Sequence, residues 1–325
     1  MSHLQERTSR STLAERFRGA LIEPGDARYD EARQLWNAAI KRKPALIAQC
    51  ADAYDVIAAL DYATGNGFDV AVRAGGHNVT GRALNDGGVV IDLSQMKGIE
   101  SDTERRVARV EPGLTWGEYN EAAGAYGLVT PSGKVSTTGV GGLALGGGLG
   151  WLVRKYGMTI DNLISAQVVT ADGRLLTASS IENPDLFWAI RGGGGNFGIA
   201  VSFQFRLHPL NEVYGGLVAW PLPVAKDLLR HYRDFIADTP DELTTVAVFL
   251  TTPEGHAAVG VAACYAGPAD EGESVLKPLT EFGTPAMVQL GAMPYHVLAG
   301  MVDAAAASHP AQWRSGNLGA FTDDA

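Results

Sequence analysis

Three clusters of glycine constrain this chain more than any other feature of its sequence. The chain has 40 glycines among 325 residues, and they concentrate in residues 73–81, 138–150 and 191–198. Glycine adopts positive φ angles and lets the backbone approach a ligand closely, and successive amides of such a loop can bind an anion. The three clusters therefore predict a large, flat, phosphorylated ligand that lies along the backbone. Tight turns at the ends of sheets are the alternative.

Composition excludes several other classes of protein. Lys+Arg 26 against Asp+Glu 36 gives a net charge of −10, so the chain has no general attraction for nucleic acid or anionic lipid. Two cysteines and seven histidines without metal-ligand spacing predict neither a disulfide framework nor a metal site. Residues 135–153 are uncharged, but their seven glycines oppose a membrane helix. We expect a cytoplasmic protein without a membrane or nucleic-acid partner.

The pattern of apolar residues divides the chain into three parts. Residues 1–39 are expected to form a polar leader and a short helix. Residues 40–209 alternate predicted strands (45–49, 69–73, 89–93, 107–111, 199–207) with helices, one of them capped by Asp52, and contain a hairpin over 166–178. After Pro209 glycine becomes sparse, and residues 210–325 are typical of a second, α+β domain. We expect this domain to be incomplete, because the sequence stops while the domain is still in progress.

The familiar nucleotide motifs fit poorly. Residues 139–144 match G-x-G-x-x-A, but no buried strand is expected before them and no helix after them. Gly133-Lys134 lacks the spacing and the hydroxyl of a P-loop. A Rossmann fold and a P-loop NTPase are therefore disfavoured.

His77 is the candidate for chemistry at the first cluster. It lies between Gly76 and Asn78, so its imidazole would contact whatever the glycine loop binds. An imidazole beside a bound cofactor can polarise it or bond to it covalently. A surface or capping histidine is the alternative.

The three clusters, read with their flanking residues, resemble one family. Residues 72–81 (VRAGGHNVTG), 138–163 and 183–199 (NPDLFWAIRGGGGNFGI) resemble, in order and spacing, the berberine-bridge-enzyme-like FAD-linked oxidases of the vanillyl-alcohol-oxidase type, the group that includes bacterial 6-hydroxy-D-nicotine oxidase. The resemblance covers about residues 40–209. It implies a two-part, PCMH-type FAD-binding domain of α+β class, followed by a substrate domain.

The resemblance also implies roles for particular residues. His77 would carry FAD covalently through the 8α-methyl group of the flavin, and amides around residues 74–78 would hold the pyrophosphate. The cofactor-binding residues implied are Arg73, Ala74, Gly75, Gly76, His77, Asn78, Gly81, Thr138, Gly139, Gly141, Gly142, Gly148, Asn162, Gly198 and Ile199.

The sequence departs from the family at several positions. Val135 stands where members with two covalent links have a cysteine, so we expect a single link. Leu143 stands where plant members often have a histidine that hydrogen-bonds the flavin. Thr138 occupies a position that tunes oxygen access in the family, and a threonine there predicts no particular oxygen reactivity.

The catalytic base is expected in a family segment beyond residue 325. Tyr156 is a candidate active-site phenol, although a structural role is at least as well supported.

The function that the resemblance implies is flavin-dependent oxidation. Hydride would pass from a C–H bond of a small alcohol or amine substrate to FAD, and molecular oxygen would reoxidise the flavin with release of peroxide. The alternatives are a flavin dehydrogenase without oxygen reactivity, an NADPH-dependent reductase with the same flavin fold, and a catalytically inert flavin-binding protein. The sequence predicts neither the substrate nor the oligomeric state.

Overall fold

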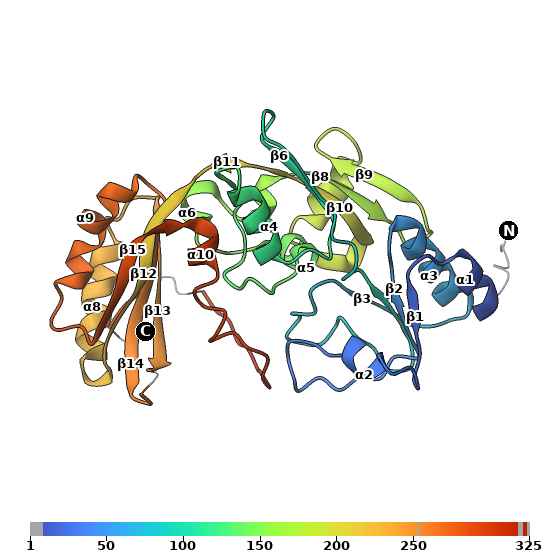
Figure 1. Cartoon of the computed structure of the whole chain (residues 1–325), viewed down its shortest axis with the longest axis horizontal. Helices are drawn as coiled ribbons and strands as arrows, with labels where there is room; N and C mark the ends of the chain where they lie inside the picture. Colours follow the sequence, from blue (N-terminus) through green and yellow to red (C-terminus); the bar gives the residue numbers. More distant parts are fainter. Residues whose placement is uncertain (1–8, 253, 318–320, 324–325) are drawn as a thin grey trace.

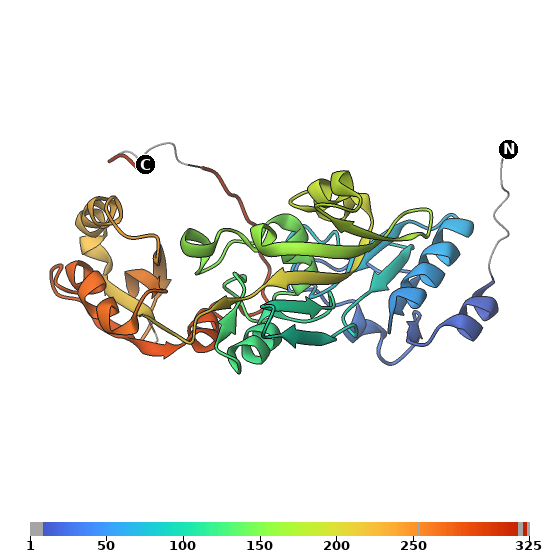
Figure 2. The same cartoon turned by 90° about the horizontal axis from the view of Figure 1, so that it is seen from above.

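The computed structural model of the chain places three main β-sheets in a row, and a fourth sheet has only two short strands, residues 128–129 and 208–209. The structure describes residues 9–252, 254–317 and 321–323. The first sheet lies near the N-terminus, the second occupies the middle of the molecule, and the third belongs to the C-terminal part (Figure 1). The view from above shows the same order along the long axis (Figure 2). The protein thus has a mixed helix-and-sheet fold, in agreement with the predicted class.

The first sheet has four strands in the order β1-β2-β4-β3. Strands β2, β4 and β3 are parallel, and β1 pairs antiparallel with β2. Helix α3 packs against this sheet, and its first turn is capped by the Asp52 side chain, as predicted. The glycine loop that contains His77 leaves the carboxyl end of β3. The bounds are α1 (Arg10–Arg16), β1 (Ala20–Ile22), α2 (Tyr29–Ala32), β2 (Leu46–Gln49), α3 (Ala53–Gly65), β3 (Val70–Arg73) and β4 (Val89–Asp92).

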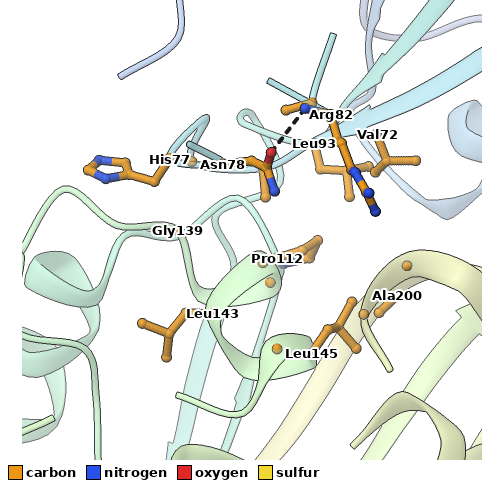
Figure 3. A pocket seen from close by; sticks show the side chains of 18 of the residues that line it. Val72, His77, Asn78, Arg82, Leu93, Pro112, Gly139, Leu143, Leu145 and Ala200 are labelled. Carbon is orange, nitrogen blue, oxygen red and sulfur yellow. Dashed lines mark hydrogen bonds between the residues drawn. The ribbon is translucent and has the colours of Figure 1, made fainter. Parts of the chain in front are cut away.

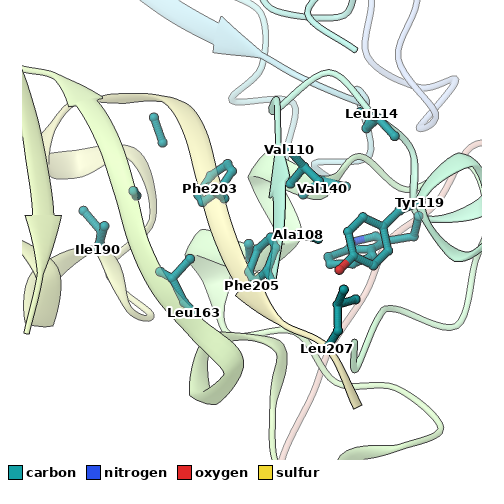
Figure 4. Packing of buried hydrophobic residues seen from close by; sticks show 14 of the residues in the cluster. Ala108, Val110, Leu114, Tyr119, Val140, Leu163, Ile190, Phe203, Phe205 and Leu207 are labelled. Atoms are coloured by element: carbon teal, nitrogen blue, oxygen red, sulfur yellow. The ribbon is translucent and has the colours of Figure 1, made fainter. Parts of the chain in front are cut away.

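The second sheet is antiparallel throughout and has the order β5-β6-β10-β8-β9. Its central strand β10 contributes Phe203 and Phe205, which stack at 5.7 Å between ring centroids in the core beneath the sheet (Figure 4). The bounds are β5 (Ile99–Asp102), β6 (Val107–Val110), α4 (Trp116–Gly124), β7 (Leu128–Val129), α5 (Val140–Gly146), α6 (Val153–Tyr156), η1 (Thr159–Asn162), β8 (Leu163–Val169), β9 (Leu175–Ser179), α7 (Pro184–Ile190), η2 (Gly194–Phe197), β10 (Ile199–Arg206) and β11 (His208–Pro209).

The third sheet has four antiparallel strands in the order β13-β14-β12-β15. Helices α8 and α9 cover one face, where Trp220 and Leu228 are fully buried. The other face contacts the middle of the molecule through Trp151 and Leu152. The bounds are β12 (Glu212–Pro221), η3 (Leu222–Val224), α8 (Ala225–Ile236), β13 (Leu243–Thr251), β14 (Ala257–Tyr265), α9 (Ala269–Thr280), β15 (Met287–Pro294) and α10 (Tyr295–Ala299).

Most of the predicted strands and helices are present, with two kinds of difference. The second glycine cluster was expected to contain no helix, and this is wrong, because α5 forms over Val140–Gly146. Strands β1, β5, β7, β11 and β15 were not predicted. Part of the predicted polar leader, residues 1–8, lies outside the described residues. The domain boundaries after residues 39 and 209 stay predictions.

Residues 135–153 do not form one continuous helix, since α5 and α6 are separate short elements. Within the described ranges, no helix is long and apolar enough to cross a membrane.

Two of the glycine clusters meet in a backbone-to-backbone contact. A Cβ atom added at Gly75 would lie 2.3 Å from the backbone nitrogen of Gly139, and one added at Gly139 would lie 2.4 Å from the backbone nitrogen of Gly75. Both distances are far below van der Waals contact, and neither neighbour is a side chain that could rotate away. Only glycine at both positions allows this approach.

We predict that Gly75→Ala lowers the free energy of unfolding by about 1–3 kcal/mol, the usual result of forcing an extra methyl group into a packed site. Gly142→Ala is the matched control, because no heavy atom lies within 4 Å of its added Cβ. Urea denaturation of both variants and the parent chain measures the difference. Equal midpoints for Gly75→Ala and the parent chain would contradict the contact.

Candidate functional site

A cavity of about 780 Å³ lies where the three glycine clusters converge. Its wall is formed by the loop after β3, the start of α5 and the loop between α7 and β10, so it lies between the first and second sheets (Figure 3). Eleven of its 28 lining residues are glycine. The volume is within the range of roughly 300–1,000 Å³ that is usual for ligand and cofactor sites.

Eleven of the fifteen predicted cofactor residues line this cavity. They are Ala74, Gly75, Gly76, His77, Asn78, Thr138, Gly139, Gly141, Gly142, Gly198 and Ile199. The structure therefore brings together residues that are more than 120 positions apart in the sequence.

The other four predicted residues lie away from the cavity wall, where each has a structural contact. The Arg73 guanidinium lies 4.0 Å from the buried Asp92 carboxylate and donates to the Ala32 carbonyl oxygen. A side chain at Gly81 would collide with Ile40, and one at Gly148 would collide with Thr159.

Asn162, the fourth of these residues, is held by hydrogen bonds. Its amide nitrogen donates to the backbone carbonyl oxygens of Tyr156 and Met158, and its side-chain oxygen lies 2.6 Å from Nε2 of His208. Cofactor contact by these four residues, as by the eleven that line the cavity, stays a prediction.

Tyr156 also lies outside the cavity wall. Its ring stacks on that of His208 at 4.1 Å between centroids, and burial raises the pKa of its phenol. This environment favours the structural role that the sequence left open.

The cavity also contains residues outside the fifteen predicted ones. Gly192, Gly193, Gly194 and Gly195 belong to the third glycine cluster, which the resemblance places along the cofactor as a segment (residues 191–198). Arg82 carried only a weak signal, its position next to Gly81. Among the described residues that line the cavity, Arg82 alone has a formal charge at neutral pH. Its side chain extends along the cavity (Figure 3), so the cavity favours an anionic group.

The glycine loop after β3 is held in a fixed conformation. Gly76 has φ of +71°, which favours glycine. The Asn78 side-chain oxygen accepts hydrogen bonds from the backbone nitrogen of Arg82 at 3.0 Å and from the Thr80 hydroxyl at 2.9 Å. These bonds leave the amides of the loop pre-arranged along the cavity wall.

His77 lies at one end of the cavity wall between an aromatic ring and two hydroxyl groups. Its ring stacks on Trp36, with 5.6 Å between centroids and 21° between planes. Its Nε2 lies 3.0 Å from the Thr137 hydroxyl, and its Nδ1 lies 3.5 Å from the Thr138 hydroxyl. Burial lowers the pKa of His77, and the negative charge of Asp303 opposes this effect. The lowered pKa favours the neutral imidazole, in which one ring nitrogen carries a lone pair.

The cavity fits a nucleotide-linked flavin by two observations. Glycines 142, 146, 192, 194 and 195 all line it, and an added Cβ at any of them would meet no heavy atom within 4 Å. These glycines therefore leave space in the cavity rather than serving close packing. The loop amides and Arg82 supply donors and positive charge for a pyrophosphate. No group of three potential metal ligands occurs in the described ranges of the chain.

Comparison with known proteins points to the same cofactor. A family model for an FAD binding domain matches residues 44–179. An FAD-linked oxidoreductase of Dictyostelium discoideum is 34% identical over 294 residues, which make up 90% of this chain and 64% of that relative.

Two crystal structures share the fold. The 6-hydroxy-D-nicotine oxidase of Arthrobacter nicotinovorans gives a TM-score of 0.84 at 32% identity, covering 89% of this chain and 64% of that one. The protein BBE-like 1 of Physcomitrella patens gives a TM-score of 0.79 at 27% identity, covering 87% of this chain and 62% of that one.

The chain thus spans less than two thirds of the length of these relatives. The matching domain, the sequence identity and the shared fold agree with the motifs of the three glycine clusters. The chain contains an FAD binding domain and is homologous to FAD-linked oxidoreductases, with 6-hydroxy-D-nicotine oxidase and BBE-like 1 among its structural relatives.

Proposed function

We propose that this chain holds FAD covalently through His77 and accepts hydride from a C–H bond of a small alcohol or amine. The observation that carries the proposal is the position of a hydrogen-bonded histidine on the wall of a glycine-lined cavity that fits a flavin nucleotide. FAD supplies the redox chemistry when bound, and the protein supplies binding, orientation and proton handling.

The residues of the chain divide this work between them. Amides of residues 75–78 and the Arg82 side chain hold the pyrophosphate, and the open glycines of α5 and of residues 192–195 admit the cofactor along the backbone. The Thr137 hydroxyl fixes the orientation of the imidazole through Nε2. Because burial favours the neutral form of the imidazole, it is available as a nucleophile.

A single covalent link is supported by the positions of the two cysteines. Cys50 lies in the core of the first sheet, and Cys264 lies in the core shared by the third sheet and the middle of the molecule. Both thiols are buried and neither lines the cavity, and burial raises the pKa of each. Neither is placed or activated for a second bond to the cofactor.

The substrate and the electron acceptor belong to the same proposal. A solved relative is named for the oxidation of 6-hydroxy-D-nicotine, an amine, which supports a small substrate with a C–H bond beside nitrogen or oxygen. We propose oxygen as the acceptor. Peroxide release during aerobic turnover separates this activity from that of a flavin dehydrogenase. The cytoplasmic location stays a prediction.

Removing His77 tests the proposed link. We expect the purified chain to be yellow, with absorption near ~450 nm that stays with the acid-precipitated protein, because a covalent flavin survives denaturation. In His77→Ala the colour should move to the supernatant. His256→Ala, in the exposed turn between β13 and β14, is the matched control and should keep its colour in the pellet. Colour in the supernatant for the parent chain would exclude the link while leaving FAD binding intact.

Filling the cavity tests the proposed position of the cofactor. Gly142→Leu places a side chain into open space within α5. Leucine is favoured over glycine in a helix by up to about 1 kcal/mol, so the cofactor-free fold should not be destabilised. We expect at least about a tenfold loss of FAD affinity in a flavin-fluorescence titration, since the cavity is blocked. Unchanged FAD affinity would show that the cofactor lies elsewhere.

A further inference from the structure

The segment of residues 303–313 contacts the neighbours of His77 on two sides of its imidazole. This C-terminal segment follows α10 (Figure 1), and its hydrogen bonds to Trp36 and Asn37 place it against the stretch between α2 and β2. Asn37 and His309 form a β-bridge there, and the Asn37 side chain accepts from the backbone nitrogen of Ala311 at 3.0 Å and donates to its carbonyl oxygen at 3.0 Å. The segment is therefore docked by main-chain contacts next to the loop that carries His77.

On one side of His77 the connection runs through Trp36. The backbone nitrogen of Trp36 donates to the Gly76 carbonyl oxygen at 3.1 Å, and its indole nitrogen donates to the Ala306 carbonyl oxygen at 2.6 Å. The rings of His309 and Trp313 make T-shaped contacts with the Trp36 indole, at 5.1 and 5.7 Å between ring centroids. Trp36 is thus tied to the glycine loop and to the C-terminal segment at once, with its face against the imidazole.

On the other side the connection runs through Asp303. Its carboxylate accepts a hydrogen bond from the backbone nitrogen of Ser136 at 2.8 Å. The next residue, Thr137, bonds His77 Nε2 at 3.0 Å. The same segment therefore fixes the hydroxyl that orients the imidazole and the indole that stacks on it.

We propose that Trp36 is a positioning residue for His77, and that residues 303–313 hold it in place so that the imidazole is oriented for attachment of the flavin. An exposed histidine in a glycine loop would sample several rotamers, and fixing it in one removes that freedom before the reaction. Trp36 does not line the cavity. Its effect passes through the orientation of the imidazole.

The proposal rests on the proposed covalent link. Attachment forms a bond between an imidazole nitrogen and the 8α carbon of the flavin, in place of one N–H and one C–H bond. The two electrons and two protons released reduce dioxygen to hydrogen peroxide, so no further reactant is needed. FAD binding itself depends on the cavity wall, of which Trp36 is not a part.

The test compares Trp36→Ala with Trp36→Phe and with Trp188→Ala, which removes an exposed indole from α7. Each chain is prepared without cofactor, mixed with FAD in aerated buffer, and assayed for bound and for acid-stable flavin over time. We expect Trp36→Ala to bind FAD with unchanged affinity but to attach it more slowly, on the order of tenfold to a hundredfold. Trp36→Phe, which keeps a stacked ring, should recover part of the rate, and Trp188→Ala should match the parent chain.

A second measurement needs no cofactor and separates the two proposals. Diethyl pyrocarbonate modifies accessible neutral histidines, and the modified tryptic peptide Ala74–Arg82 reports on His77 alone. We expect faster modification of His77 in cofactor-free Trp36→Ala than in the parent chain, because the stacked face is uncovered. Unchanged modification and unchanged attachment in Trp36→Ala would overturn the positioning role. A parent chain that binds FAD without attaching it would overturn the covalent link, whatever the modification rates show.

Discussion

The contact between Gly75 and Gly139 is the constraint on which the rest of the site depends. It joins the loop of the first sheet to the loop that begins α5, backbone against backbone. Because neither residue has a side chain, the two loops approach closely enough to place His77 beside Thr137 and Thr138. A side chain at either glycine would push the loops apart and open the hydrogen bond that orients the imidazole.

The cavity that results has few charges, in a chain with a net charge of −10. Arg82 is the single charged residue in its described lining, and eleven of the 28 lining residues are glycines, which offer only backbone groups. Such a surface recognises an anion through fixed dipoles and one cation, and the open glycines accept a flat ring system without side-chain rearrangement. The C-terminal segment of residues 303–313 then packs at the end at which His77 lies, through its contacts with Trp36 and Ser136.

The sequence predicts the parallel strands of the first sheet and the presence of a cofactor cavity. It does not predict features that depend on contacts between distant residues. The parallel strands of the first sheet and the Asp52 cap follow from apolar spacing and capping chemistry, which are local. Helix α5 does not, because its glycines disfavour a helix, and it is stabilised by tertiary packing, including that of Gly141 on Pro112 and of Val140 and Ala144 in the core cluster that contains Trp116. The glycine clusters predict a cofactor cavity, but sequence alone cannot separate Gly142, which faces open space, from Gly148, which packs on Thr159. The contact of Trp36 with the C-terminal segment could not be predicted from sequence patterns, since it joins residues 270 positions apart.

Mass spectrometry of the tryptic peptides tests the central claim most directly. Trypsin cuts after Arg73 and Arg82 and releases His77 in the nine-residue peptide Ala74–Arg82, which contains no other histidine and no cysteine. The account predicts that this peptide carries the mass of one FAD, less two hydrogen atoms, and that fragmentation assigns the added mass to His77. Flavin recovered only in free form, or attached to any other peptide, would contradict it.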